Sequence, residues 1–314
     1  MKKIIQLQLV IPEQLAGTRA DRALAQLLPD YSRSRLKSWL LYGQIKINGE
    51  TWPPKQAVEG HEHVSVNAEL DEQTHWQGEA IDLDIVHEDE AIIVINKPAG
   101  LVVHPAVGNQ QHTLVNALLH HCPELESIPR AGLIHRIDKD TTGLLVIAKT
   151  IEAHHSLVQQ LQEKTMQREY EAIVQGELIS GGTIDEPIDR HPRQRTKMAV
   201  IETGRPSVTH YRVLEKFPHY TRIKVNLETG RTHQIRVHMA HINHSLVGDQ
   251  TYGGRFKLPK GASDALQTAL RDFKRQALHA RKLSFTHPDS GENVVYEAPL
   301  PTDLKILLHK LRER

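Results

Sequence analysis

The feature that most constrains the fold of this chain is a long acidic stretch in its first third. Nine acidic residues and no lysine or arginine lie between Glu69 and Glu90. Such a segment repels the phosphate backbone of a nucleic acid and is typical of a linker between folded units. We therefore predict a domain boundary near residues 71–78, which divides the 314 residues into units 1–75 and 76–314. A chain of this length exceeds one ordinary domain, so two domains are expected.

The N-terminal unit is predicted to contain two helices together with short strands. Apolar residues at helical spacing predict helices over residues 19–28 and 32–43, with Ser32 as the N-cap of the second. Alternation of apolar and polar residues predicts an edge strand around residues 5–9. Further strands are predicted over 45–47 and 63–66.

The same unit is locally basic although the whole chain carries a net charge of only +1. Six basic residues and two acidic ones lie between Gly17 and Gly49, and Arg33, Arg35 and Lys37 cluster at the start of the second helix. A helix N-terminus favours phosphate, so these three residues are candidates for RNA binding. On charge alone, a solvated helix face explains the cluster equally well.

Candidate chemistry lies in the stretch Gly132–Ala148. The apolar run Leu144–Ala148 predicts a buried strand, and the polar residues before it are predicted to form a turn that contains Arg136 and Asp138. A carboxylate beside arginines ionises easily and can act as a nucleophile or a base. Composition alone favours the simpler interpretation that Asp138 forms an Asx-turn.

A second polar cluster shifts this balance. Leu227–His238 contains a Thr-Gly-Arg-Thr-His-Gln-Ile-Arg run, and two further motifs occupy Asn96–Pro105 and Arg168–Ala172. Together with the His-Arg-Ile-Asp run ending at Asp138, these motifs resemble, in the same order, those of the RluA family of pseudouridine synthases.

The resemblance implies an α+β fold. A small S4-like RNA-binding domain (1–75) would precede a pseudouridine synthase catalytic domain (76–314) with a long mixed, mainly antiparallel sheet and a central cleft. It also implies isomerisation of uridine to pseudouridine in a hairpin loop of 23S rRNA near the subunit interface, with a pre-ribosomal large-subunit particle as partner. Another rRNA or tRNA site, a non-catalytic S4-type RNA-binding protein and a nucleoside glycosidase stay open as alternatives.

The resemblance assigns roles to individual residues. Asp138 matches the essential aspartate of the family, and Arg136 would fill the place vacated by the flipped uridine. Tyr170 would pack on the base, and Ile235 would line the pocket. Arg231 would pair with Asp138 and hold it charged.

Several other kinds of site find no support. Cys122 is the only cysteine, so the chain cannot form an internal disulfide, which suits a reducing compartment. Four histidines between 233 and 244 lack the adjacent carboxylate of a zinc site, and no glycine-rich loop has phosphate-cradling spacing. The reaction has no redox step, so neither cofactor nor metal is expected. The apolar runs are too short to span a bilayer, and we predict a cytoplasmic monomer.

Further elements of the second unit are predicted from periodicity. The basic segment 189–197 is predicted to be an exposed loop, either solvated or touching RNA, and its four positive charges favour RNA. Helices are expected over 113–120, 153–162, 265–273 and 304–311, and in a segment after Gly230; strands are expected over 91–95, 144–148, 170–174, 209–214, 221–227, 282–286 and 294–297.

Overall fold

The chain folds into two compact units, Met1–His75 and Trp76–Arg314. The computed structural model describes all residues except 1, 2, 30, 32, 71–75, 106–108, 255–257, 260 and 314. The division falls at the position that the acidic stretch predicts, although residues 71–75 of the predicted boundary and the predicted N-cap Ser32 lie outside the described residues.

The first unit packs two helices on a three-stranded antiparallel sheet. The sheet has the order β1-β3-β2, so β1 is at an edge, as its alternating sequence predicts. Leu24, Leu36 and Leu40 are fully buried between the helices and the sheet. The elements are β1 (Lys3–Val10), η1 (Glu13–Leu15), α1 (Ala20–Leu27), α2 (Arg33–Leu41), β2 (Ile45–Ile47) and β3 (His63–Leu70).

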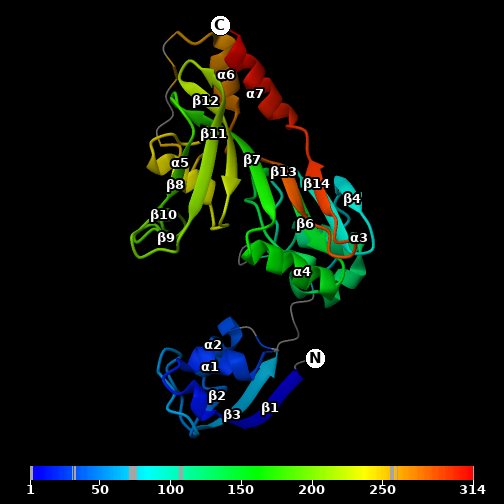
Figure 1. Ribbon diagram of the computed structural model, residues 1–314, viewed down its shortest axis with the longest axis vertical. Helices are drawn as coiled ribbons and strands as arrows, with labels where there is room; N and C mark the ends of the chain where they lie inside the picture. The colour runs from blue at the N-terminus through cyan, green and yellow to red at the C-terminus, as the bar shows by residue number, and fades with distance from the viewer. Residues whose placement is uncertain are drawn as a thin grey trace. The chain divides into compact units, whose positions relative to one another are not determined.

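The second unit is built on one long mixed sheet (Figure 1). Its strand order is β4-β5-β6-β13-β7-β12-β11-β8, with β14 beside β13. Among the described strands of this sheet, only β6 and β13 run parallel, which confirms a mixed and mainly antiparallel sheet. The strands are β4 (Ile85–Glu88), β5 (Ile92–Lys97), β6 (Thr142–Ala148), β7 (Gln167–Gln175), β8 (Gly182–Asp185), β11 (Val208–Phe217), β12 (Tyr220–Leu227), β13 (Leu278–Thr286) and β14 (Asn293–Glu297).

Helices cover both halves of this sheet. Helix α4 packs against β6 and β13, whereas α6 and α7 share a hydrophobic cluster with β7, β11 and β12 (Figure 1). Helix α4 begins with a hydroxyl N-cap, because the Thr150 hydroxyl accepts from the Ala153 amide at 3.0 Å. The helices are α3 (Leu114–His121), α4 (Ile151–Gln162), α5 (Gln234–His241), α6 (Asp264–Asp272) and α7 (Thr302–Arg312), with the short η2 (Pro123–Ser127) and η3 (Pro129–Gly132).

The basic segment 189–197 is only partly the loop that its sequence predicts. Its flanks form a small antiparallel hairpin of β9 (Ile188–Arg190) and β10 (Met198–Val200), and Arg193 and Arg195 between them are exposed. The two strands are too short to show an alternating pattern, so periodicity could not reveal them.

Gly143 permits the parallel contact between β6 and β13. Its φ is +112°, and a Cβ at this position would lie 2.2 Å from the Ala280 carbonyl oxygen.

We expect Gly143→Ala to lower the free energy of unfolding by about 3 kcal/mol, because the cost of the strained backbone and the cost of the steric overlap add. Denaturant titration measures this change. Gly291→Ala is the matched control, since Gly291 has a φ of +71° and open space around it; equal losses in both variants would contradict the steric argument.

Among the described residues, every helix is too short or too polar to cross a bilayer.

Candidate active site

Asp138 lies in the turn between η3 and β6, and its carboxylate faces helix α5. Its Oδ2 accepts a hydrogen bond at 2.9 Å from Nη1 of Arg236, 98 residues further along the chain. The Thr141 amide donates to the backbone carbonyl of Asp138 rather than to its side chain. The turn therefore closes through its backbone and leaves the carboxylate for a long-range partner, which is not the Asx-turn that composition alone favours. The Asp138 side chain is 18% exposed, so one side of it stays accessible.

Arg236 is shared between two carboxylates. Its Nε and Nη2 donate to Oδ2 and Oδ1 of Asp249 at 2.6 and 2.9 Å, and its third nitrogen donates to Asp138. The Asp249 side chain is fully buried. Burial alone would raise the pKa of Asp249, but the hydrogen bonds and charge of Arg236 hold that pKa below its usual range. The same contacts outweigh the burial of Arg236 and raise its pKa, so this guanidinium is a permanent charge in the site.

Tyr252 and His233 complete the surroundings of Arg236. The Tyr252 ring lies under the guanidinium, with its centroid 5.0 Å from Cζ, and its hydroxyl is 2.8 Å from Nδ1 of His233. Nε2 of His233 lies 3.9 Å from Oδ1 of Asp138. Burial, together with the charges of Arg236 and Arg136, lowers the pKa of His233. Near neutral pH this imidazole is therefore uncharged, and Arg236 supplies the positive charge beside Asp138.

The predicted pairing of Arg231 with Asp138 is wrong. The Arg231 guanidinium donates to the Pro206 carbonyl oxygen at 3.3 and 3.4 Å. The Arg231 amide donates to Oε1 of Gln234, a buried residue that also bonds to β11 through its Nε2. These contacts fix Arg231 in the turn before α5, while Arg236 is inside the helix and directed at Asp138.

Lys97 ties the motif at Asn96–Pro105 to the Asp138 turn. Its Nζ is buried and donates to the carbonyl oxygens of Pro98, Leu101 and Lys139 at 2.7, 2.9 and 2.8 Å. Burial lowers the pKa of Lys97 to about 7, against the opposing charges of Asp140 and Asp138. Three carbonyl acceptors match the three donors of an ammonium group. Lys97 therefore anchors the backbone directly after Asp138.

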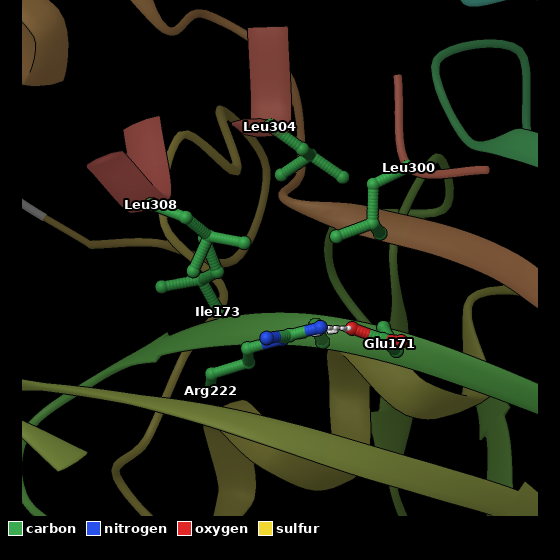
Figure 2. A pocket seen from close by; sticks show the side chains of 7 residues that line it. Glu171, Ile173, Arg222, Leu300, Leu304 and Leu308 are labelled. Atoms are coloured by element: carbon green, nitrogen blue, oxygen red, sulfur yellow. Dashed lines mark hydrogen bonds and ion pairs between the residues drawn. The ribbon is translucent and has the colours of Figure 1, made fainter. Parts of the chain in front are cut away.

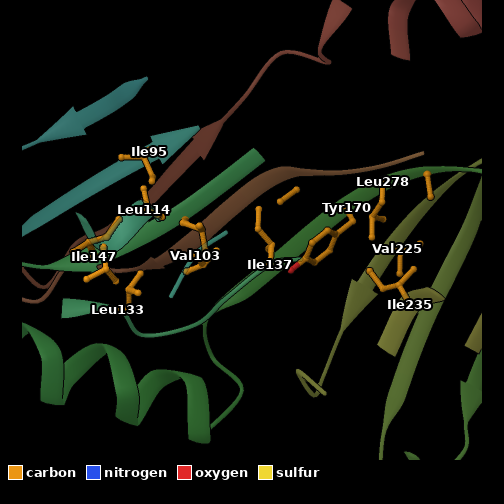
Figure 3. Packing of buried hydrophobic residues seen from close by; sticks show 14 of the residues in the cluster. Ile95, Val103, Leu114, Leu133, Ile137, Ile147, Tyr170, Val225, Ile235 and Leu278 are labelled. Carbon is orange, nitrogen blue, oxygen red and sulfur yellow. The ribbon is translucent and has the colours of Figure 1, made fainter. Parts of the chain in front are cut away.

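The other residues expected at the site, Arg136, Tyr170 and Ile235, differ in their exposure to solvent. Tyr170 and Ile235 are 5% and 4% exposed and belong to one hydrophobic cluster, where Tyr170 lies between Ile137 and Val225 (Figure 3). Arg136 is exposed. Burial raises the pKa of the Tyr170 hydroxyl. The structure thus places Tyr170 and Ile235 in the core beside the Asp138 turn and leaves Arg136 open to solvent.

The pocket drawn in Figure 2 is not at this site. It has about 180 Å³ of empty space and lies between α7 and strands β7 and β12, above the Arg222–Glu171 ion pair. None of the residues expected to contact the substrate lines it. The central cleft implied by the family resemblance stays a prediction.

The histidines of α5 and its flanks have other partners than a metal. Nδ1 and Nε2 of His238 bond to the Thr209 hydroxyl and the Glu186 carbonyl, and His244 bonds to the Gln175 carbonyl. Within the part of the chain that the structure describes, one group has metal-like spacing: His87, Asp89 and His287.

That group has the wrong proton arrangement for a metal site. Nδ1 of His287 accepts from the amides of Asp289 and Ser290, at 3.3 Å each. Its Nε2 therefore carries the proton and donates to Asp89 at 2.9 Å. The group is a hydrogen-bonded link between the β4–β5 turn and the end of β13.

The three candidate RNA-binding residues of α2 are not equivalent. Arg33 donates twice to Oδ2 of the buried Asp21, at 3.0 and 2.6 Å, so it has a structural partner within the first unit. Burial opposes ionisation of Asp21, but hydrogen bonds from Arg33 and Arg19 lower its pKa. Lys37 is exposed and Arg35 is half-buried.

Sequence reasoning missed Arg236, Asp249, Tyr252 and Lys97. Arg236 had a usable signal, because it stands between the apolar residues Ile235 and Val237 in a helix, and a buried cation requires an anionic partner. Asp249 and Tyr252 lie in an irregular turn with no periodic pattern, so no comparable signal marks them.

The sequence and the fold are similar to those of known proteins. Residues 91–241 match the family described as RNA pseudouridylate synthase. The chain is 53% identical over 313 residues to ribosomal large subunit pseudouridine synthase D of Escherichia coli, covering 99% of this chain and 96% of the relative. The protein of the same name from Pseudomonas aeruginosa is also 53% identical, with 100% and 98% covered. The structure of human RNA pseudouridylate synthase domain containing 4 superposes with a TM-score of 0.59 at 28% identity, over 73% of this chain and 92% of the human one.

Proposed function

The chain belongs to the RluA family of pseudouridine synthases, and on this premise we propose that it converts uridine to pseudouridine in large-subunit ribosomal RNA. The observation that carries the proposal is the 2.9 Å contact between Asp138 and Arg236, which presents a partly exposed carboxylate against a permanent cation. Relatives that match nearly the whole chain carry the name of a large-subunit enzyme, which supports the choice of RNA.

The reaction breaks the bond between N1 of uracil and C1′ of the ribose and forms a bond between C5 and C1′. The Asp138 carboxylate is suited either to attack C1′ or to remove a proton from the neighbouring sugar carbon. The uracil leaves as an anion, turns and rejoins through C5. The proton on C5 is then lost and N1 takes up a proton, so the product is an isomer of uridine. Because no electrons enter or leave, Asp138 needs no redox partner.

The surrounding residues take complementary roles in this proposal. The exposed Arg136 occupies the place left by the extruded uridine, Tyr170 packs on the base, and Ile235 forms part of the pocket wall. Arg231, whose guanidinium faces Pro206, contacts the RNA rather than Asp138.

We further propose that the first unit is an S4-like RNA-binding domain that uses Arg35 and Lys37, with Arg33 positioned by Asp21. The exposed basic residues between β9 and β10 would add a second RNA contact, because Tyr252 bonds to the Met198 amide and so joins this hairpin to the Arg236 site. The substrate would be a hairpin loop of 23S rRNA near the subunit interface, in a pre-ribosomal particle, and the enzyme would act in the cytoplasm as a monomer.

Mapping of pseudouridines in ribosomal RNA tests the proposed function. Cells that lack this protein should lack pseudouridine at uridines of the subunit-interface hairpin loop, and the purified protein should restore it. An unchanged map would overturn the proposed substrate. Release of free uracil during the reaction would instead indicate a glycosidase.

The basic helix leads to a separate prediction. Lys37→Glu should weaken RNA binding and reduce the slope of log K against log salt by about one, because one phosphate contact is lost. Binding titrations at several salt concentrations measure the slope. Lys55→Glu makes the same charge change at another exposed position of the first unit and should leave the slope nearly unchanged. Equal salt slopes in the wild type and Lys37→Glu would show that the face of α2 that carries Lys37 does not contact RNA.

A further inference from the structure

Arg168, the second residue of β7, is a buried arginine whose side chain makes no hydrogen bond or ion pair with any described residue. The residue is 8% exposed, and its buried Nε has no partner. A guanidinium has five N–H donors and no acceptor, so leaving it unpaired inside the protein costs free energy. The side chains of Arg236 and Lys97, by contrast, donate to acceptors of the protein. The guanidinium of Arg168 therefore has a buried donor, Nε, that lacks an acceptor in the described part of the chain.

The position of Arg168 relates it directly to the reacting groups. Alternate residues of β7 are buried, so Arg168 lies on the same side of the strand as Tyr170. Arg168 and Asp138 are both close enough for their charges to affect the Tyr170 hydroxyl. The positive charge of Arg168 lowers the pKa of this hydroxyl, and the negative charge of Asp138 raises it. Nη1 of Arg168 also lies against Gly230, since a Cβ there would be 2.8 Å from it. The guanidinium thus lies between the Asp138 turn and the turn that precedes α5.

His135 gives a second, independent sign of a missing ligand at the same place. Both of its ring nitrogens are buried and unpartnered within the described part of the chain. Burial, with the nearby charge of Arg168, lowers the pKa of His135 to about 3, so the ring is neutral at physiological pH. Two nearby side chains with buried, unpartnered nitrogen atoms are unusual in a folded protein, and His135 is only three residues from Asp138.

Resting on the proposed function, we propose that Arg168, with His135 beside it, binds the phosphodiester next to the uridine that is extruded toward Asp138. An RNA chain presents a phosphate on each side of every nucleotide, and a planar guanidinium matches two phosphate oxygens. A full negative charge compensates a buried cation better than a neutral uracil carbonyl does. The phosphate would thereby hold the sugar in place while its base turns.

A chemical double-mutant cycle tests this proposal. The substrate is an RNA hairpin that the wild-type protein modifies, synthesised with either the natural linkages or a neutral methylphosphonate at one of the two phosphates flanking the target. For the wild type, one methylphosphonate should lower kcat/KM about tenfold to a hundredfold. Arg168→Met should lower kcat/KM on the natural RNA by a similar factor and should no longer respond to the methylphosphonate.

The thermal stability of the Arg168→Met variant distinguishes an RNA-binding role of Arg168 from a structural role. Because Arg168 has no protein partner to lose, the thermal midpoint of Arg168→Met should be equal to or above that of the wild type. Gly230→Ala keeps the arginine but displaces its Nη1, and should reproduce the reduced response to methylphosphonate. Arg212→Met, at an exposed position on β11, is the matched control and should behave as wild type.

Two results would overturn the proposal. The first is that methylphosphonate, at either linkage, lowers kcat/KM by the same factor in Arg168→Met as in the wild type. The two changes would then act independently, which places Arg168 away from those phosphates. The other is a clear fall in the thermal midpoint of Arg168→Met, which would assign the side chain to the fold. If the wild type forms no pseudouridine in any ribosomal RNA, the proposed function fails first, and that result is distinct from either of these.

Discussion

Asp138→Asn is expected to abolish pseudouridine formation while RNA binding is retained. The amide has the size of the carboxylate but can neither attack C1′ nor take up a proton, so we expect the rate to fall roughly a thousandfold or more. Because the Asp138 side chain contacts Arg236 through one oxygen only, the amide oxygen can keep that contact and preserve the fold. Single-turnover assays on ribosomal RNA measure the rate, and filter binding measures the affinity.

Asp140→Asn is the matched control for this substitution. Asp140 lies two residues further along the same turn, and its carboxylate acts on Lys97 only through its charge. Its amide variant should retain the rate within a few fold. If Asp138→Asn forms product at the wild-type rate, the catalytic assignment is wrong and the RNA-binding alternative gains support.

Arg236→Gln is expected to lose both activity and stability. Its removal leaves the fully buried Asp249 carboxylate without its guanidinium partner and takes the cation away from Asp138. Breaking one partner of a buried ion pair costs about 3–5 kcal/mol, so the thermal midpoint should fall markedly. Product formation should fall at temperatures at which circular dichroism still shows a folded protein, because Asp138 has lost its fixed partner.

The contrast with Arg231→Gln makes this prediction specific. Arg231 lies in the same motif, but among the described residues its guanidinium donates only to the Pro206 carbonyl, near the surface. Arg231→Gln should therefore change the thermal midpoint little and reduce turnover less than Arg236→Gln does. The reverse order of the two variants would contradict the assignment of Arg236 as the partner of Asp138.

Much of the fold was predictable because strands and helices reveal themselves by periodicity. The strands predicted over 144–148 and 221–227 lie within β6 and β12, and the helix predicted over 153–162 lies within α4. The same logic fails for β9 and β10, which have three residues each. It also cannot show that β6 pairs in parallel with β13, more than 130 residues away, because pairing depends on the whole topology.

The site was predictable at the level of motifs and less so at the level of individual contacts. The motifs in the sequence predict that Asp138 and residues 227–238 form one site, but they do not show which arginine of that cluster is directed at Asp138. Gln234 decides this point, since its amide group anchors the preceding turn to β11 and so directs Arg231 away. Such choices depend on three-dimensional hydrogen bonding, to which neither composition nor spacing gives access.

The Asp138–Arg236 contact also has a consequence for how the protein fails on heating. Its two members belong to segments separated by 98 residues, one leading into β6 and the other in α5. A slight loosening between these segments would separate the pair while every strand and helix remains intact. We therefore expect turnover to be lost at a lower temperature than the secondary structure. We also expect turnover to return on cooling, provided that the protein has not unfolded.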